Sequence, residues 1–337
     1  MIPAEESGPT PGQQNDDPPW RIDVHHHHLP AEYVKALASA GINGFAKRSF
    51  PQWDPGAQLE MMNQTGIQTA VMSVGAPGVH FGDPGFARAL ARRLNEYSAT
   101  WVQKHPDRLG FFATLPMPDT AASVAEAAYA LDELGADGIL LLASANGEYL
   151  GHPRFDELMA ELNKRKAIVF IHPTTPPSEA DLGLEFSSAV VEFVFDTTRA
   201  LVNLIYNGVF ERYPDITWIV AHAGGTLPYV TYRLAIIEQN EAVRERSPKG
   251  GLAYLKRLYY DTALSPTPHA MAALKSLVGS EQILFGSDYC WLPSRIVRKE
   301  IEDLNALSVF DQAELTAIQK DNSLKLFRRF QQTARNA

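Results

Sequence analysis

Four consecutive histidines, at positions 25–28, end a short run of residues that is rich in β-branched side chains. Alternate side chains of a β-strand point to opposite faces, so His25 and His27 share one face. Two imidazoles side by side at a strand end are suited to bind a divalent metal. A purification tag and a solvated His-rich loop are the alternative interpretations. Tags are usually longer and terminal, whereas this run lies inside an expected strand, which favours the metal site.

The same alternation predicts the surroundings of this strand. The odd-numbered residues of segment 23–27 are all polar, as expected where a strand end opens onto a site. The even-numbered side begins with Ile22 and Val24, which we expect to face covering helices. We therefore interpret His26 and His28 as packing or solvated residues rather than as ligands.

The composition narrows the class of protein. The 337 residues are enough for a large core, and no apolar run approaches the roughly 20 residues of a membrane span. A net charge of −9 argues against general binding to nucleic acid or to an anionic membrane. Cys290 is the only cysteine, which excludes an internal disulfide framework and favours a reducing compartment. With no secretory signal in view, we expect a cytoplasmic protein.

Short apolar runs alternate with stretches of helical periodicity along the chain. The runs that we expect to form buried strands are 21–25, 67–74, 109–115, 136–143, 167–172, 216–222, 257–263 and 282–287. The stretches that we expect to form helices are 57–62, 86–105, 120–134, 153–166, 188–212, 228–246, 268–278, 294–306, 310–318 and 321–333.

Eight alternating strand and helix units indicate a (β/α)₈ TIM barrel within the α/β class. A doubly wound open sheet has the same alternation, but no Gly-x-Gly-x-x-Gly follows the first strand to support its dinucleotide-binding form. No change of composition separates two domains. We expect a disordered N-terminal tail over residues 1–19 and one barrel domain over 20–334.

Polar residues gather where the expected strands end. His25 and His27 end the first strand, His172 the fifth and His222 the sixth, and Asp288 follows the eighth. Each alone has an ordinary explanation, as a structural histidine or a capping aspartate. Because the carboxyl ends of barrel strands meet at one mouth, their joint occurrence predicts a metal site with imidazole and carboxylate ligands.

Several motifs resemble one known group, the decarboxylases related to aminocarboxymuconate-semialdehyde decarboxylase in the amidohydrolase superfamily. The likeness runs from about 21 to 328 and rests on Asp23-x-His-x-His with Pro30, Trp53-Asp54-Pro55, Leu115-Pro116-Met117, His172-Pro173, Gly208 to Pro214, His222-Ala-Gly-Gly, Leu227-Pro-Tyr and Gly286-Ser287-Asp288. Segments 77–83, 172–177 and 195–199 look most like 6-methylsalicylate decarboxylase-like proteins.

This resemblance implies one divalent metal, held by His25, His27, His172 and Asp288, with His222 beside it as an acid/base or electrostatic group. The residues alone leave open which imidazole is not a ligand. Binuclear relatives use a lysine after strand 4 or 5, and neither expected strand ends in one. We therefore expect a mononuclear site, with zinc preferred and manganese as the alternative, and no organic cofactor.

The implied reaction is the non-oxidative decarboxylation of an aromatic acid of the salicylate type, with 6-methylsalicylate as the first candidate. The substrate carboxylate and ortho-hydroxyl would chelate the metal, and Asp288 would protonate the carboxyl-bearing ring carbon with the help of His222. The main alternative is a metal-dependent hydrolase of an ester, lactone or amide, in which the metal activates water. A non-catalytic, metal-dependent binding barrel is a further alternative.

Candidate substrate contacts come from aromatic residues and from polar residues on loops. They are Trp53, His80, Phe81, Phe195, Arg199 and Trp291, together with Phe193, and each is also explained as ordinary core or surface. Arg48 does not align with the arginine that grips a second carboxylate in the muconate-semialdehyde enzymes, which favours a monocarboxylate. We expect a homodimer or higher homo-oligomer, with segment 188–212 or the C-terminal helices as the interface and with Arg233 as another possible contact.

Overall fold

Eight short strands lie side by side in the order β1-β4-β5-β6-β9-β10-β11-β12, and each neighbouring pair is parallel. The structure is a computed structural model, and it describes residues 20–176 and 183–331. The strands are β1 (Arg21–His27), β4 (Ile67–Ser73), β5 (Leu109–Thr114), β6 (Gly138–Leu142), β9 (Ile168–His172), β10 (Thr217–Val220), β11 (Tyr259–Asp261) and β12 (Ile283–Leu284). All eight predicted strands are therefore confirmed.

The last strand returns to the first and closes the sheet. The backbone nitrogen of Val24 donates a hydrogen bond to Phe285 O (3.0 Å), and that of Asp288 donates one to His25 O (2.9 Å). A parallel bridge joins His26 to Tyr289 just beyond these contacts. The predicted (β/α)₈ barrel is confirmed, and its closure places the eighth strand's polar end next to the first strand's histidines.

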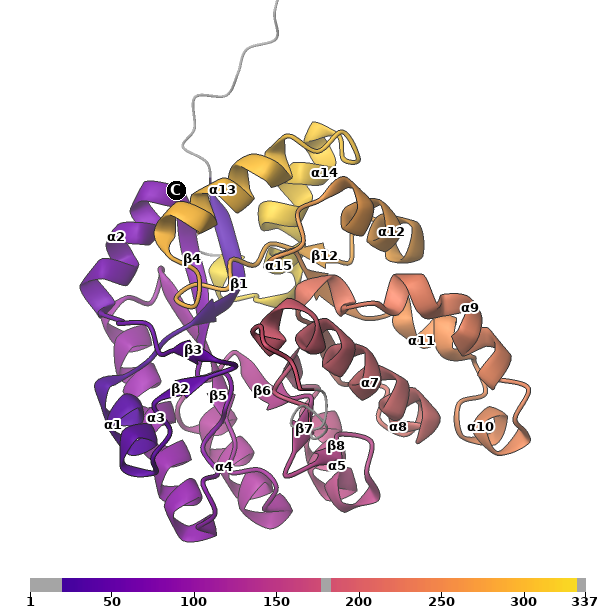
Figure 1. Cartoon of the computed structure of the whole chain (residues 1–337), viewed down its shortest axis with the longest axis horizontal. Coiled ribbons are helices and arrows are strands. Elements are labelled where there is room, and N and C mark those ends of the chain that lie inside the picture. The colour runs from indigo at the N-terminus through magenta and orange to yellow at the C-terminus, as the bar shows by residue number, and fades with distance from the viewer. Residues whose placement is uncertain (1–19, 177–182, 332–337) are drawn as a thin grey trace, which may run out of the picture.

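Helices surround the barrel in chain order, from α2 to α4 on one side, through α7 to α11, to α13 and α14 (Figure 1). They are α1 (Ala31–Ser39), α2 (Pro55–Thr65), α3 (Pro84–Lys104), α4 (Thr120–Asp132), α5 (Asp156–Lys164), α7 (Glu192–Tyr206), α8 (Val209–Arg212), α9 (Leu227–Ile237), α10 (Glu241–Arg246), α11 (Gly251–Leu255), α12 (Pro268–Val278), α13 (Ser294–Asn305), α14 (Gln312–Thr316) and α15 (Asn322–Leu326). Two small hairpins, β2 (Gly44–Phe45) with β3 (Arg48–Ser49) and β7 (Ser144–Ala145) with β8 (Glu148–Tyr149), lie in the loops.

Several helix starts follow from capping residues in the sequence. The side chains of Asp54, Asp83 and Asp119 accept hydrogen bonds from the backbone at the starts of α2, α3 and α4. Where 188–212 was predicted as one helix, a 3₁₀ turn, α7 and α8 occur instead. The break lies at Gly208, whose φ is +68° and where a Cβ atom would lie 2.5 Å from Arg246 O.

The apolar core forms two layers, one inside the barrel and one between strands and helices. Ile22 and Val24 belong to the inner cluster with Phe170, so the prediction that they face the helices is wrong. The reason is a register shift in β1 between Asp23 and His26, which reverses the alternation after Val24. The shift lets apolar residues fill the barrel below and His25 and His27 point into its mouth.

Within residues 20–176 and 183–331, no helix combines the length and the hydropathy needed to cross a bilayer. The predicted disordered tail over 1–19 lies outside the described residues, as do 332–334 at the predicted end of the barrel domain.

Candidate metal centre

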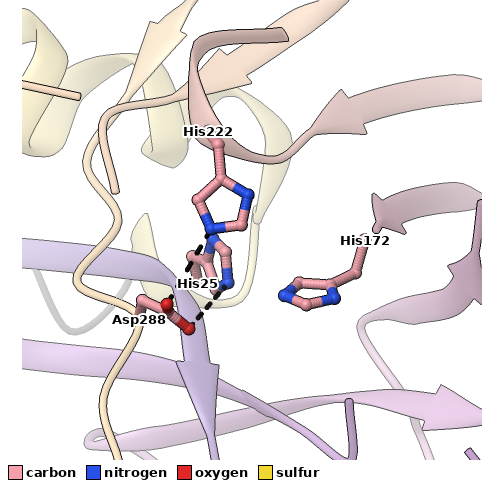
Figure 2. A group of neighbouring side chains, drawn as sticks. All are labelled: His25, His172, His222 and Asp288. Carbon is pink, nitrogen blue, oxygen red and sulfur yellow. Dashed lines mark ion pairs between the residues drawn. The ribbon is translucent and has the colours of Figure 1, made fainter. Parts of the chain in front are cut away.

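Four imidazoles and one carboxylate converge at the barrel mouth. The ligating atoms of His25, His172, His222 and Asp288 all lie within 4.8 Å of one another (Figure 2). His27 joins them, because its Nε2 lies 3.1 Å from Nε2 of His25 and 3.2 Å from Nε2 of His172. All five side chains are buried. These are the five residues that the sequence placed at the metal site.

The carboxylate of Asp288 has one oxygen near the imidazoles of His25 and His27 and the other near the imidazole of His222. Its Oδ1 is 3.3 Å from Nε2 of both His25 and His27, and its Oδ2 is 3.8 Å from Nε2 of His222. Figure 2 marks the ion pairs of Asp288 with His25 and with His222. Asp288 is thus in reach of both the candidate ligands and the candidate acid/base group.

The outer ring nitrogens show that these residues fit a metal ion. Nδ1 of His25 and of His172 donate to oxygen acceptors, at 2.7 Å to Asp261 Oδ2 and 2.7 Å to Pro173 O. Nδ1 of His27 is 3.0 Å from the hydroxyl of Ser73. With Nδ1 engaged in this way, Nε2 of each neutral imidazole can present its lone pair to a common point. A divalent cation satisfies this arrangement.

Buried polar atoms without partners support the same fit. Both ring nitrogens of His222 and Oδ1 of Asp288 are buried with no hydrogen-bond partner among the described residues. Such groups are costly unless a ligand, ion or water completes them. The cluster therefore provides the donor set of a divalent-metal site, with imidazole nitrogen and carboxylate oxygen ligands.

Burial and neighbouring charges shift the pKa values of the cluster in different directions. Burial opposes the charged form of Asp288, but the neighbouring imidazoles of His222, His25 and His27 hold the pKa of its carboxyl well below its usual range. Burial also opposes the charged form of His25, but the carboxylates of Asp261 and Asp288 raise its pKa to about 10. Burial lowers the pKa of His27, and it lowers that of His172 further together with the neighbouring imidazoles. The ionised carboxylate and these neutral imidazoles are the protonation states that bind metals.

The backbone holds two of the site residues in the left-handed region, with φ of 52° at Asp288 and 55° at His222. Non-glycine residues stay there only when their surroundings fix them. The backbone nitrogen of Asp288 is held by His25 O, and Ser287 donates to Asp23 through its nitrogen (3.1 Å) and its hydroxyl (2.5 Å). Asp23 therefore fixes the Ser287–Asp288 turn instead of facing the metal with His25.

Asp261 is a site residue that the sequence reasoning missed. Its Oδ2 accepts from Nδ1 of His25, and its Oδ1 accepts from the backbone nitrogens of His222 (2.9 Å) and Ala263 (3.0 Å). Asp261 ends β11, the predicted seventh strand. The expected strand ran on to residue 263, so a rule that looks for polar residues at strand ends passed over Asp261.

His26 and His28 face away from the cluster. Nδ1 of His26 bonds to Asp23 Oδ2 (2.8 Å), and Nε2 of His28 bonds to the hydroxyl of Ser98 (2.9 Å). Both imidazoles are buried, so they are packing residues and not solvated ones.

Three of the seven predicted substrate residues line cavities near the barrel mouth, and four do not. Trp291 and Phe193 line a cavity of about 40 Å³ beside His172 and Asp288, and His80 lines a separate cavity of about 210 Å³. The other four lie elsewhere. Trp53 donates to Gln58, Phe81 contacts Phe86, Phe195 is 41% exposed, and Arg199 lies over its ring and near Glu192.

The small cavity beside Asp288 has a charged residue in its wall that was not among the predicted contacts. Arg48 lines it with Phe45 of the β2–β3 hairpin, and its Nη2 donates to Trp291 O (3.0 Å). Arg48 also lines a wider groove of about 430 Å³ with His222 and Leu264. The mouth therefore holds one cation near the cluster.

Comparisons with known proteins give consistent results. Residues 22–329 match the sequence profile of the amidohydrolase family. Decarboxylase yanB of Aspergillus niger is 37% identical over 93% of this chain and 89% of that protein. 6-Methylsalicylic acid decarboxylase acuB of Aspergillus aculeatus is 34% identical over 94% of this chain and 98% of that protein.

A solved structure matches at the level of the whole barrel. The crystal structure of 5-carboxyvanillate decarboxylase from Novosphingobium aromaticivorans, complexed with manganese and 4-hydroxy-3-methoxy-5-nitrobenzoic acid, has a TM-score of 0.82 to this chain. It is 26% identical, and the match covers 92% of this chain and 96% of that one.

Proposed function

This chain belongs to the amidohydrolase family, and we propose that it is a metal-dependent carboxy-lyase that converts a salicylate-type acid into a phenol and CO₂. The match to decarboxylases over nearly the whole chain supports this reaction over the hydrolase alternative. The observation that carries the proposal is the position of Asp288, which has one carboxylate oxygen near His25 and the other near His222. 6-Methylsalicylate is the first candidate substrate, because acuB is named for that acid.

We propose His25, His27, His172 and Asp288 as the metal ligands and His222 as the imidazole that stays free. The Nε2 atoms of the three ligand histidines lie 3.1 and 3.2 Å apart, whereas Nε2 of His222 lies 3.8 Å from Asp288 Oδ2. When bound, the divalent ion supplies positive charge that orients an anionic aromatic acid and neutralises it.

The proposed site is mononuclear, with zinc preferred on the basis of its three imidazole ligands. The strands that precede the lysine position of binuclear relatives end at Leu142 and at His172. The manganese in the 5-carboxyvanillate decarboxylase structure makes manganese the alternative. Activity and affinity measured with each metal in turn separate the two.

Asp288 and His222 together deliver one proton per turnover in the proposed mechanism. Asp288 rests as a carboxylate, so it must first receive a proton, and His222 Nε2 near its Oδ2 is the donor. Asp288 then protonates the carboxyl-bearing ring carbon, which makes the ring an electron sink. The bond to the carboxyl carbon breaks, its electron pair returns to the ring, and CO₂ leaves. Solvent reprotonates His222.

The groove above the cluster suits a monoanionic aromatic substrate. Phe45, Phe193 and Trp291 provide aromatic surface, and Arg48 provides one positive charge at the rim. Water around the reacting carbon is limited by the burial of all the cluster residues. These features support the class of substrate and leave its ring substituents to be determined.

We further propose that residues 20–334 form one cytoplasmic catalytic domain that assembles as a homodimer. One face of α9 exposes Tyr229 and Tyr232, which are 90% and 79% accessible, together with Ile236 at 56%. Their spacing of three, four and seven residues forms one stripe on the helix. Such an apolar stripe is typical of a protein interface, and it supports α9 as the contact between two copies.

The decisive experiment is a metal-supplemented assay with 6-methylsalicylate and a small panel of salicylates. CO₂ and the phenolic product are followed together. We expect them in equal amounts, with loss of both on chelation and recovery on adding back metal. Hydrolysis of an ester or lactone panel, with no CO₂ from any aromatic acid, would move the enzyme to the hydrolase alternative.

A further inference from the structure

A second cavity lies at the ends of strands on the side of the barrel that does not carry Asp288. It has a volume of about 210 Å³ and lies between the loops that follow β4, β5, β6 and β9. His80, Met117, Leu142, Asn146 and Thr174 are among its lining residues. It is distinct from the small cavity at Asp288 and from the groove at His222.

Residues close to two of the candidate ligands, His172 and His27, line the cavity. Leu142 is the partner of His172 in the β6–β9 register, and Thr174 follows that histidine by two residues. On the other side, a Cβ atom at Gly75 would lie 2.7 Å from Cε1 of His27, so only glycine allows this close packing. The cavity wall begins two residues later, at Pro77.

The space at Asp288 is too small for a whole aromatic acid. Its volume is about 40 Å³, whereas a cavity of about 150 Å³ accommodates benzene. A ring held at the metal must therefore extend into adjoining space. The groove of about 430 Å³ and the cavity of about 210 Å³ are each large enough for one substituted ring. The groove carries the charge of Arg48 and suits the charged end of an acid, which leaves the cavity for the opposite end.

Buried polar groups fix the walls of this cavity. Asn95 bonds to both backbone groups of Thr114, accepting from its nitrogen (2.9 Å) and donating to its oxygen (3.0 Å). Asp196 accepts from the backbone nitrogen of Thr174 and from the hydroxyl of Tyr149, both at 2.9 Å. These bonds join three of the four loops to helices behind them, which is how a preformed ligand site is built.

The fourth loop carries His80. It is fixed by the hydroxyl of Tyr33, which donates to Gly78 O at 2.7 Å. Nδ1 of His80 is buried and has no hydrogen-bond partner among the described residues. The described residues that line the cavity include no Asp, Glu, Lys or Arg, so the cavity suits an uncharged group. An uncharged oxygen would complete the unpartnered nitrogen.

We propose that this cavity receives the end of the aromatic substrate opposite its carboxylate, and that His80 bonds to an uncharged oxygen substituent there. The preferred substrates are then salicylate-type acids with a hydroxyl group at the far side of the ring. This inference rests on the proposed function for the orientation of the acid. A second carboxylate at that end is excluded, because no cation in the described lining would neutralise it.

The test measures binding to metal-free protein, which separates the cavity from the chemistry. Phenol and benzene serve as probes with and without a hydroxyl group, and dissociation constants come from NMR titration. We expect His80→Phe to weaken phenol binding at least 5-fold and benzene binding less than 2-fold. His80→Gln, which keeps a hydrogen-bonding group, should restore most of the difference. His269→Phe, at an exposed position on α12, is the matched control.

The same variants are then assayed with metal, using 2,4-dihydroxybenzoate and salicylate. His80→Phe should raise KM for the dihydroxy acid alone. Equal effects on both probes, or no effect on either, would overturn the subsite. If the binding difference is found but no aromatic acid releases CO₂, the subsite stands and the proposed reaction fails. If CO₂ is released without any binding difference, the reaction stands and the subsite fails.

Discussion

Nδ1 of His25 lies 2.7 Å from Oδ2 of Asp261, and both side chains are fully buried. Through its other oxygen, the same carboxylate holds the backbone nitrogen of His222. One residue of β11 thus orients a proposed ligand on β1 and places the proposed proton donor after β10. Because it touches neither substrate nor metal in the proposed site, Asp261 is a positioning residue.

Replacing Asp261 by Asn tests this relationship. The amide keeps the size of the side chain but removes the charge that holds the His25 proton on Nδ1. We expect metal affinity to fall about 10–100-fold, as is usual when the outer partner of a ligand histidine is lost. Competition with a chelating dye measures it. Asp215→Asn, at an exposed position, is the control, and unchanged affinity in Asp261→Asn would contradict the assigned role.

Paired variants of His27 and His222 decide which imidazole is the ligand. We expect His27→Ala to lose most of the bound metal and His222→Ala to keep about one ion per chain. Since His222 is proposed to donate the proton, its variant should lose about 10²–10⁴-fold in kcat. Metal analysis of the purified proteins and steady-state kinetics give both values. The reverse metal contents would make His222 the ligand and His27 its neighbour.

Asp288→Asn separates proton delivery from metal binding. The amide oxygen can still reach a metal, but it does not carry the transferable proton. We expect kcat to fall at least about 10²-fold with metal content largely retained. Asp303→Asn, on the surface of α13, should behave as the unmodified enzyme. Full activity of Asp288→Asn with metal bound would require another acid.

The α9 stripe makes a prediction about assembly. A charge at Tyr232, which is 79% exposed, would be buried without a partner in the proposed dimer. We expect Tyr232→Glu to elute as a monomer, with light scattering giving its mass. His269→Glu adds the same charge on a different helix and should remain dimeric. A protein that is monomeric before any substitution would rule out the interface.

The sequence predicted the barrel and the five residues of the cluster because both depend on local patterns. Each strand is a short apolar run, and a polar residue ends or follows those that carry the cluster, as in segment 167–172. The barrel rule brings those ends together. Asp261 was missed because the expected strand was drawn two residues too long, to 263. The faces of Ile22 and Val24 were predicted wrongly because a register shift leaves no mark in the residue types.

The walls around the cluster were harder to predict, because they come from loops. Phe195 and Arg199 were chosen as substrate contacts, but Phe195 is partly exposed and Arg199 lies near Glu192. Arg48 reaches the site because the β2–β3 hairpin folds over the mouth, and two-residue strands have no periodicity to reveal them. Loop positions depend on long-range contacts that one sequence does not display.

Glu300 provides a prediction about stability and pH. Its Oε1 accepts from the backbone nitrogen of Leu264 (2.7 Å), while its Oε2 is buried without a partner among the described residues. Burial, with Asp288 as a nearby negative charge, raises the pKa of Glu300 from 4.5 to about 8. Leu264 lines the groove beside His222, so this carboxyl group supports one wall of the mouth.

Between pH 4.5 and 8 the folded protein therefore holds a proton on Glu300 that the unfolded chain has released. The free energy of unfolding falls as pH rises through that window and levels off above it. Glu300→Gln keeps an acceptor for Leu264 and removes the titration. We expect the variant to gain stability relative to the unmodified protein between pH 5 and pH 9, by at most about 5 kcal/mol at 1.36 kcal/mol per pKa unit. Urea unfolding at both pH values measures the difference in the free energy of unfolding. The same difference at pH 5 and at pH 9 would contradict a buried, neutral Glu300.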